Sequence, residues 1–300
     1  MKHFLYPIIV FVLIRTMVAS ADSRSFQTLS SGDITVQYVV ADSMYAKKAL
    51  ATLSRAFEEI TFDLQVTESE TLSVLIVPSR SEFGKYIHGE LPKWTGAFAI
   101  PRYNKMVVKS PRWDRGKNDF RANLIHELTH LLVHEMVGNK PIPRWIDEGL
   151  AIFYSREQKW KTSTALSKAM ATHSLIPLPD IDYVLKFHQI KAELAYQESY
   201  SAVRYLLATY DIDAIQIILQ GIRENRDLDK SFILATGSPF RVFEHEWIQY
   251  VEKNYKWFWL SDINNFIWIS ILLLVILAVI IKRIRNRRTI EEWEKFPEAE

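Results

Sequence analysis

The feature that most constrains this chain is the stretch 123–132, NLIHELTHLL, which contains the pattern His-Glu-x-x-His. On an α-helix, residues four apart lie one turn above each other, so His126 and His130 can direct two imidazoles at one metal ion. Glu127 lies about 100° around the helix, where its carboxylate can reach a water at the metal without ligating the ion. Leucines at 124, 128, 131 and 132 form an apolar stripe. The stretch therefore predicts a buried helix with two metal ligands and a general base.

A catalytic site of this kind needs a third protein ligand, and His134 continues the four-residue spacing. Three histidines at i, i+4 and i+8 span about 12 Å of helix axis. The outer two cannot close on one ion without the middle one blocking it. We therefore do not expect His134 to be a ligand.

A better third ligand lies downstream of the first helix. Gly138 and Asn139 end that helix, two prolines turn the chain, and a second helix is predicted from Pro143 to Ile152. This helix places Glu148 18 positions after His130. Packed against the first helix, it can present the carboxylate to the metal and leave a fourth position for water, as open catalytic zinc sites do.

The two motifs together, HELTH at 126–130 and WIDEGLA at 145–151, resemble the gluzincin metallopeptidases, especially the peptidase-MA-like group and its aminopeptidase relatives. In that group the Glu of the second motif ligates zinc. The resemblance therefore implies that Zn²⁺ is held by the two histidines and by Glu148 rather than Asp147. It also implies that the substrate is a peptide or protein.

The chain before the metal helix has the pattern of a small α/β unit. Residues 33–40 and 71–77 are rich in β-branched side chains and predict two strands, and residues 44–64 have helical apolar spacing between them. Residues 96–100 and 105–108 flank a Pro-Arg-Tyr-Asn turn and predict a hairpin. After the metal motifs the pattern is helical, with helices predicted at 164–171, 196–210, 212–222, 227–234 and 240–255.

In gluzincins the strand before the metal helix is the sheet edge on which the substrate lies by β-augmentation, and Gly96 to Ile100 resembles that strand. An ordinary structural hairpin is the alternative. The aminopeptidase relatives carry Gly-Ala-x-Glu-Asn here, and its Glu holds the free amino terminus of the substrate. Ala99 occupies that position in this chain. The departure favours an endopeptidase over an aminopeptidase.

The segment Tyr196 to Leu206 resembles the gluzincin helix that brings a tyrosine to the oxyanion. The spacing of that motif selects Tyr196, whose phenol could donate a hydrogen bond to a tetrahedral oxyanion. Tyr200 is the second choice. Aromatic side chains at helical spacing are also typical of a core, which is the alternative for both tyrosines.

Both ends of the chain have the pattern of membrane targeting. Residues 1–21 combine Lys2, an apolar run and small residues before Ala21, which predicts a signal peptide, with an uncleaved anchor as the alternative. Residues 263–281 are 19 residues without a charge, close to the length of a membrane span, and basic residues follow them. The positive-inside rule then places the tail 282–300 in the cytoplasm and the body outside it. Membrane lipid is thus an expected partner of the C-terminal helix.

Charge and cysteine content exclude several classes of function. Lys and Arg total 37 against 35 Asp and Glu, and the small excess lies at the two ends, so nucleic acid is not an expected partner. The chain has no cysteine, which excludes thiolate metal ligation, cysteine catalysis and disulfides. Any active site must use histidines and carboxylates.

Together these patterns predict an α+β, thermolysin-like or gluzincin-like metallopeptidase domain with a helical C-terminal half and one C-terminal transmembrane helix. The predicted parts are the signal peptide 1–21, an N-terminal α/β part 22–110, a zinc-site and helical part 111–260, the span 263–281 and the tail 282–300. The predicted function is zinc-dependent peptide hydrolysis, with Glu127 and Tyr196 as catalytic residues, at the periplasmic or otherwise extracytoplasmic face of a cytoplasmic membrane. The alternative is a membrane-anchored metal-binding or interaction module without turnover.

Overall fold

A computed structural model describes residues 25–67, 70–87, 95–114, 119–157, 164–255 and 263–294. The predicted signal peptide, 1–21, and the last six residues of the predicted tail lie outside this part. The strands are β1 (Phe26–Ser31), β2 (Ile34–Val39), β3 (Leu72–Val77), β4 (Ala97–Ile100) and β5 (Lys105–Lys109). The α-helices are α1 (Ser43–Leu64), α2 (Arg80–Lys85), α3 (Pro111–Asp114), α4 (Phe120–Met136), α5 (Arg144–Ser155), α6 (Thr164–Ala171), α7 (Gln189–Arg223), α8 (Leu228–Thr236), α9 (Phe240–Tyr255) and α10 (Ile263–Glu294). The 3-10 segments are η1 (Val40–Asp42), η2 (Pro101–Tyr103) and η4 (Leu178–Lys186).

The five strands form one mixed sheet in the order β1-β2-β3-β5-β4. The strands β2 and β3 are parallel and joined by α1, as the sequence predicts, and β4 and β5 form the predicted antiparallel hairpin. The sequence analysis missed β1, which pairs antiparallel with β2. None of the six residues of β1 is buried, so the strand lacks the apolar alternation by which a half-buried strand is recognised. The β4 strand lies at the edge of the sheet.

Alternate residues of the central strands face two different apolar layers. Val74 and Ile76 belong to the main core, which is shared with α1 and α4, whereas Leu75 and Val77 face a smaller core around Phe83 of α2. This alternation is the period of two that strand geometry imposes. Helix α4 packs beside α1 and also contacts β4 and β5. The metal helix is therefore held against the edge of the sheet on which β4 lies.

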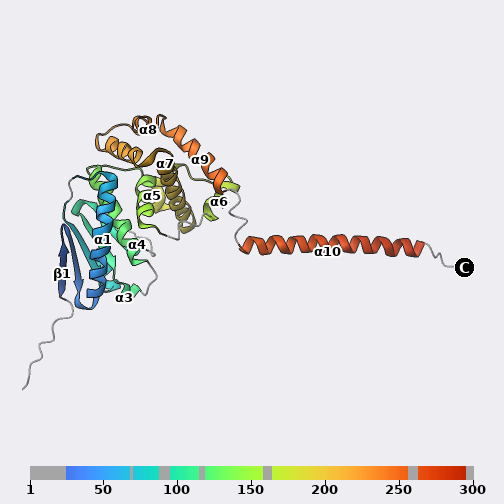
Figure 1. Ribbon diagram of the computed structural model, residues 1–300. Helices are drawn as coiled ribbons and strands as arrows, with labels where there is room; N and C mark the ends of the chain where they lie inside the picture. The colour runs from blue at the N-terminus through green and yellow to red at the C-terminus, as the bar shows by residue number, and fades with distance from the viewer. Residues whose placement is uncertain are drawn as a thin grey trace, which may run out of the picture.

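The helical half is assembled around α5 and α7, which lie against each other, and α5 also packs against α4 (Figure 1). A Cβ atom added at Gly149 of α5 would lie 2.5 Å from the backbone oxygen of Ser199, so glycine allows α5 and α7 to approach closely. The predicted helices 196–210 and 212–222 both lie within α7, and the predicted break between them is confirmed, because the backbone at Asp211 is non-helical, with a φ of 60° and a ψ of −177°. This arrangement brings the Glu148 motif and the Tyr196 segment together.

The C-terminal helix α10 stands apart from the other helices in Figure 1. Its segment Ile267–Arg287 is long and apolar enough to cross a membrane, and none of it is buried against the rest of the protein. The predicted span, 263–281, begins four residues earlier and ends before the basic residues that this segment includes. The chain thus has one helix that meets the length and composition of a membrane span.

Candidate metal centre

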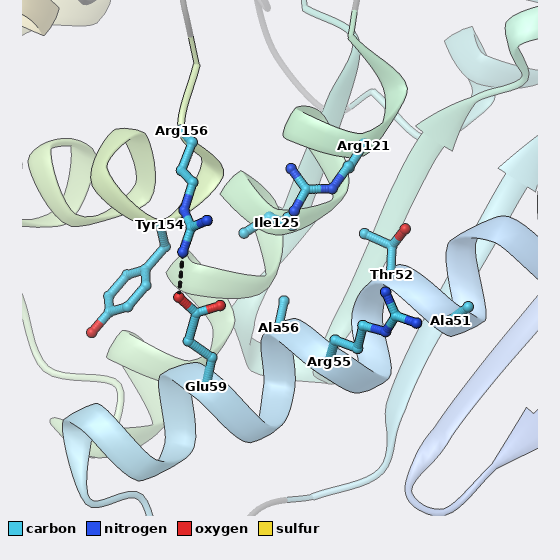
Figure 2. A pocket seen from close by; sticks show the side chains of 9 residues that line it. All are labelled: Ala51, Thr52, Arg55, Ala56, Glu59, Arg121, Ile125, Tyr154 and Arg156. Atoms are coloured by element: carbon cyan, nitrogen blue, oxygen red, sulfur yellow. Dashed lines mark hydrogen bonds and ion pairs between the residues drawn. The ribbon is translucent and has the colours of Figure 1, made fainter.

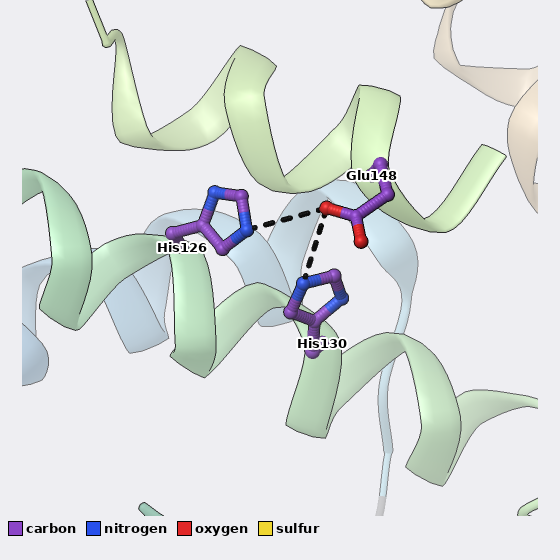
Figure 3. Close-up of side chains that lie close together, drawn as sticks. All are labelled: His126, His130 and Glu148. Carbon is purple, nitrogen blue, oxygen red and sulfur yellow. Dashed lines mark ion pairs between the residues drawn. The ribbon is translucent and has the colours of Figure 1, made fainter. Parts of the chain in front are cut away.

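His126 and His130 on α4 converge with Glu148 on α5, as the sequence predicts. Oε2 of Glu148 lies 3.4 Å from Nε2 of His126 and 3.7 Å from Nε2 of His130. Figure 3 shows the carboxylate directed from α5 between the two imidazoles. One ligand atom from each of the three residues lies within 4.8 Å of the others. The three side chains therefore form one cluster that could hold a metal ion.

The two helices that carry the cluster are firmly anchored. Helix α4 begins at the N-cap Asp119, whose side chain accepts a hydrogen bond from the backbone N–H of Ala122. Leu124, Leu128 and Leu131, which belong to the predicted apolar stripe, are buried in the main core. On α5 the side chain of Trp145 is fully buried and stacks against Phe243 of α9. The ligands thus project from elements that packing holds in place.

The donors and their spacing fit a zinc ion. Two imidazoles and one carboxylate form the open catalytic type of site, with bonds of about 2.0–2.2 Å and one position left for water. Donor atoms arranged tetrahedrally at that bond length lie roughly 3.3–3.6 Å from one another. The two distances from the Glu148 oxygen, 3.4 and 3.7 Å, are close to this spacing. Small side-chain movements would suffice for coordination.

Each candidate ligand also has a charged neighbour on its outer side, which we call its outer partner, and the contact at His130 is a hydrogen bond. Nδ1 of His130 lies 2.7 Å from Oδ1 of Asp147, and Nδ1 of His126 lies 3.1 Å from Oε1 of Glu157. The second oxygen of Glu148, Oε1, lies 3.2 Å from Nε of Arg144. A hydrogen-bonded carboxylate such as Asp147 fixes the orientation of a metal-binding imidazole and raises its basicity. The contacts of His126 and Glu148 are ion-pair distances without hydrogen-bond geometry.

His134 is placed outside the cluster. Its Nε2 atom lies 3.6 Å from Oδ2 of Asp147, so this histidine contacts the outer partner of His130 rather than the ligand atoms. Among the described residues, the grouping that could hold an ion contains His126, His130 and Glu148 without His134.

The cluster gathers buried negative charge. Four carboxylates, those of Glu127, Asp147, Glu148 and Glu157, surround the two imidazoles, while Arg144 supplies one guanidinium. Burying several charges is costly unless opposite charge compensates them. A divalent cation between the imidazoles and Glu148 would supply that compensation, which is a further way in which these residues fit a metal.

The pKa shifts of the candidate ligands reflect the same concentration of buried charges. Burial lowers the pKa of His126, but the carboxylates of Glu148 and Glu157 raise it more, so that it lies well above the usual value. Burial raises the pKa of Glu148, but the neighbouring histidines and Arg144 outweigh this effect and hold it below the usual value.

Glu127 lies beside the edge strand, as a general base for a substrate on that strand would need to. The backbone N–H of Ala99 in β4 donates a hydrogen bond to its carboxylate and lowers its pKa. Burial and the Glu148 carboxylate raise the pKa of Glu127, while His126 and His130 lower it, and the net shift is upward. A raised pKa brings a carboxylate closer to neutrality, where it takes up a proton more readily.

The two candidate tyrosines on α7 are placed differently. Tyr196 lies near the cluster, because Glu148, Arg144 and Glu127 all act on its phenol. Burial, and then the Glu148 carboxylate, raise the pKa of Tyr196 well above its usual value, so the phenol keeps its proton. The ring of Tyr200 instead lies 5.7 Å from the guanidinium of Arg204. Of the two, Tyr196 has the neighbours expected of a residue at the site.

The family comparison agrees with this geometry. The family model described as the Peptidase MA superfamily matches residues 87–253, which is more than half of the chain. The chain belongs to the Peptidase MA superfamily. This assignment supports a peptidase and agrees with the resemblance carried by the HELTH and WIDEGLA motifs. No curated protein matches the chain.

Sequence reasoning missed the outer partners of this peptidase-superfamily site. Asp147 was considered only as a competitor of Glu148 for the metal, yet it contacts His130. The position of Asp147 next to Glu148 in the sequence was the signal that could have indicated this contact. Glu157 gave no signal, because it lies nine residues after Glu148 and beyond the left-handed residue Arg156 that ends α5.

Proposed function

We propose that the protein is a zinc-dependent endopeptidase that acts at the extracytoplasmic face of a membrane. The observation that carries this proposal is the convergence of His126, His130 and Glu148, each with its own outer partner, beside Glu127 at the sheet edge. Membership of the Peptidase MA superfamily supports the reaction class.

In this proposal His126, His130 and Glu148 hold Zn²⁺. When bound, the ion supplies Lewis-acid activation of water and of the scissile carbonyl. Glu127 accepts a proton from the attacking water and returns it to the leaving amine. The backbone of Ala99 acts on the carboxylate of Glu127, so this carboxylate lies near the strand on which a substrate would lie.

Tyr196 is the proposed donor to the oxyanion that develops on the substrate. Its phenol lies in the field of Glu148 and Arg144 and stays protonated, so its O–H is able to donate. A preorganised donor of this kind stabilises the transition state more than the ground state. We assign Tyr196 to this role in preference to Tyr200.

The open edge of β4 supports an extended peptide as the substrate. Among the described strands, β4 pairs only with β5, so its other side is available for pairing with a substrate strand. Ala99 has no charge with which to hold a free amino terminus, which favours cleavage within a chain.

The proposed location rests on α10 and on the residues that follow its apolar part. Lys282, Arg283 and Arg285 follow the apolar run, so the positive-inside rule puts this end in the cytoplasm and the domain outside it. Protease accessibility in spheroplasts would test this topology. The body should be digested while the tail stays protected, and the opposite pattern would overturn the location.

The reaction is tested with the full chain purified in detergent. Wild type should contain one zinc per chain and cleave an unfolded protein, whereas Glu148→Ala should lose most of the zinc and the cleavage together. Elemental analysis and mass spectrometry of the digest measure the two quantities. Zinc without turnover on any unfolded protein would favour the non-catalytic metal-binding module, and full zinc in Glu148→Ala would remove that residue from the site.

A further inference from the structure

Three arginines from three segments line one small cavity, shown in Figure 2. Arg55 comes from α1, Arg121 from the first turn of α4, and Arg156 from the residue that ends α5. The cavity has a volume of about 160 Å³. Small side chains of α1, those of Ala51, Thr52 and Ala56, complete part of its wall.

Positive charge around this cavity exceeds negative charge. Nη2 of Arg156 lies 2.9 Å from Oε1 of Glu59, the one carboxylate that lines the cavity. Within the part of the chain that the structure describes, no ion pair joins Arg55 or Arg121 to a carboxylate. Two guanidinium groups thus share the cavity without an acidic partner. Like charges placed together repel, and an anion between them would remove that cost.

Two of the arginines also occupy positions that do not favour them. Arg121 lies in the first turn of the 17-residue helix α4, where the helix dipole disfavours a cation. Arg156 has a φ of 56°, in the left-handed region that a residue with a side chain adopts at some cost. Arg121 and Arg156 therefore border the cavity from positions that local preference opposes.

We propose that the cavity binds a small free oxyanion, with phosphate or a phosphate monoester as the chemical class. Guanidinium groups match phosphate oxygens with paired N–H donors. A water molecule occupies roughly 30 Å³ of the liquid. A cavity of 160 Å³ therefore has room for an ion of five non-hydrogen atoms.

The cavity lies next to two segments of the metal centre. Ile125, which lines it, precedes His126, and Arg156 precedes Glu157, which contacts His126. The cavity thus borders the chain segments that carry both residues. The proposal itself rests on the arginine cavity and is independent of peptide hydrolysis.

Calorimetric titration of the full chain in detergent with inorganic phosphate at low ionic strength tests this site. We expect saturable binding, weakened at least about tenfold in Arg121→Gln and in Arg55→Gln, because each loses charge-assisted hydrogen bonds. Both side chains are exposed and glutamine is a good helix former, so the variants should fold as wild type does. Arg80→Gln, an equally exposed change on α2, should bind phosphate like wild type.

The same titration after removal of metal by a chelator separates this cavity from the metal centre. Phosphate should bind the chelated protein with unchanged affinity. Loss of binding on chelation would place the phosphate at the metal and overturn the proposal. Equal affinity in wild type and the double variant Arg55→Gln/Arg121→Gln, or no saturable binding to wild type, would also overturn it.

Discussion

Oδ1 of Asp147 lies 2.7 Å from Nδ1 of His130, so the residue next to the candidate ligand Glu148 orients another candidate ligand on the neighbouring helix. Oε2 of Glu148 lies 3.7 Å from Nε2 of the same His130. The adjacent residues Asp147 and Glu148 of α5 thus contact the imidazole of His130 at its two nitrogens. The contact between Asp147 and Nδ1 leaves Nε2 as the nitrogen available to a metal.

We expect Asp147→Asn to weaken zinc binding by about 10- to 100-fold, because loss of an outer partner typically has this effect. The substitution keeps the size of the side chain but removes the charge that stabilises the metal-bound imidazole. Competition with a chromophoric chelator measures the affinity. Asp213→Asn, an exposed change on α7, is the matched control and should bind zinc as wild type does. Wild-type affinity in Asp147→Asn would show that the 2.7 Å contact does not support the metal.

The ligand cluster could be predicted because its spacing follows from helix geometry. His126 and His130 lie four apart on α4, and the turn between two helices brought Glu148 within reach. The outer partners follow from tertiary packing instead. Glu157 reaches His126 from beyond the end of α5, and no local pattern encodes that return of the chain.

The distinction between local pattern and tertiary packing also separates the predicted strands from β1, which was not predicted. The buried strands β2 and β3 carry apolar patterns that local sequence reveals, whereas β1 is exposed and is defined by its pairing with β2. The kink in α7 at Asp211 falls at the break predicted between helices 196–210 and 212–222, so a local pattern indicated it as well. Patterns of burial and helix breaks are readable from sequence, while the pairing of an exposed strand depends on a partner elsewhere in the fold.

Replacement of Glu127 by glutamine should leave zinc bound and abolish most hydrolysis. The amide keeps the approximate shape of the side chain but cannot accept the proton, and general-base catalysis typically contributes about 10²- to 10⁴-fold. Steady-state cleavage of an unfolded protein, with zinc content measured on the same sample, checks both parts. A near wild-type rate in Glu127→Gln would refute the proposed base.

Tyr196→Phe should give a smaller loss of turnover than Glu127→Gln. The substitution removes one donor to the oxyanion while the other electrostatic stabilisation remains. Tyr200→Phe is the matched control on the same helix and should retain wild-type turnover. A loss in Tyr200→Phe that exceeds the loss in Tyr196→Phe would reverse the assignment.

Gly149→Ala should destabilise the fold by about 1–3 kcal/mol, the usual cost of overpacking. The added Cβ would lie 2.5 Å from the backbone oxygen of Ser199 and 2.5 Å from Cγ2 of Val203, and the backbone oxygen cannot rotate away. Chemical denaturation measures the loss. Gly84→Ala on α2 is the control, because a Cβ there meets nothing within 4 Å. Equal stability of the two variants would show that α5 and α7 have room to separate.

The buried Glu198 on α7 should make stability fall as pH rises from about 5 to 8. Burial raises its pKa to about 8, against an ordinary value of 4.5, although the Ile176 N–H donates to the carboxylate and opposes the shift. The folded state therefore keeps a proton that the unfolded chain loses between these two values. The stabilisation is fully present below pH 4.5 and is lost progressively until the pH passes 8.

Glu198→Gln removes this titration, so the variant should gain stability relative to wild type as pH increases. The difference in unfolding free energy should change by up to about 1.4 kcal/mol per pH unit, the limit for one proton. Urea denaturation of both proteins at pH 5, 6, 7 and 8 measures this difference and cancels the titration of all other groups. Glu193→Gln, an exposed change on the same helix, should keep a constant difference from wild type. Parallel profiles for wild type and Glu198→Gln would mean that Glu198 is ionised in the folded protein.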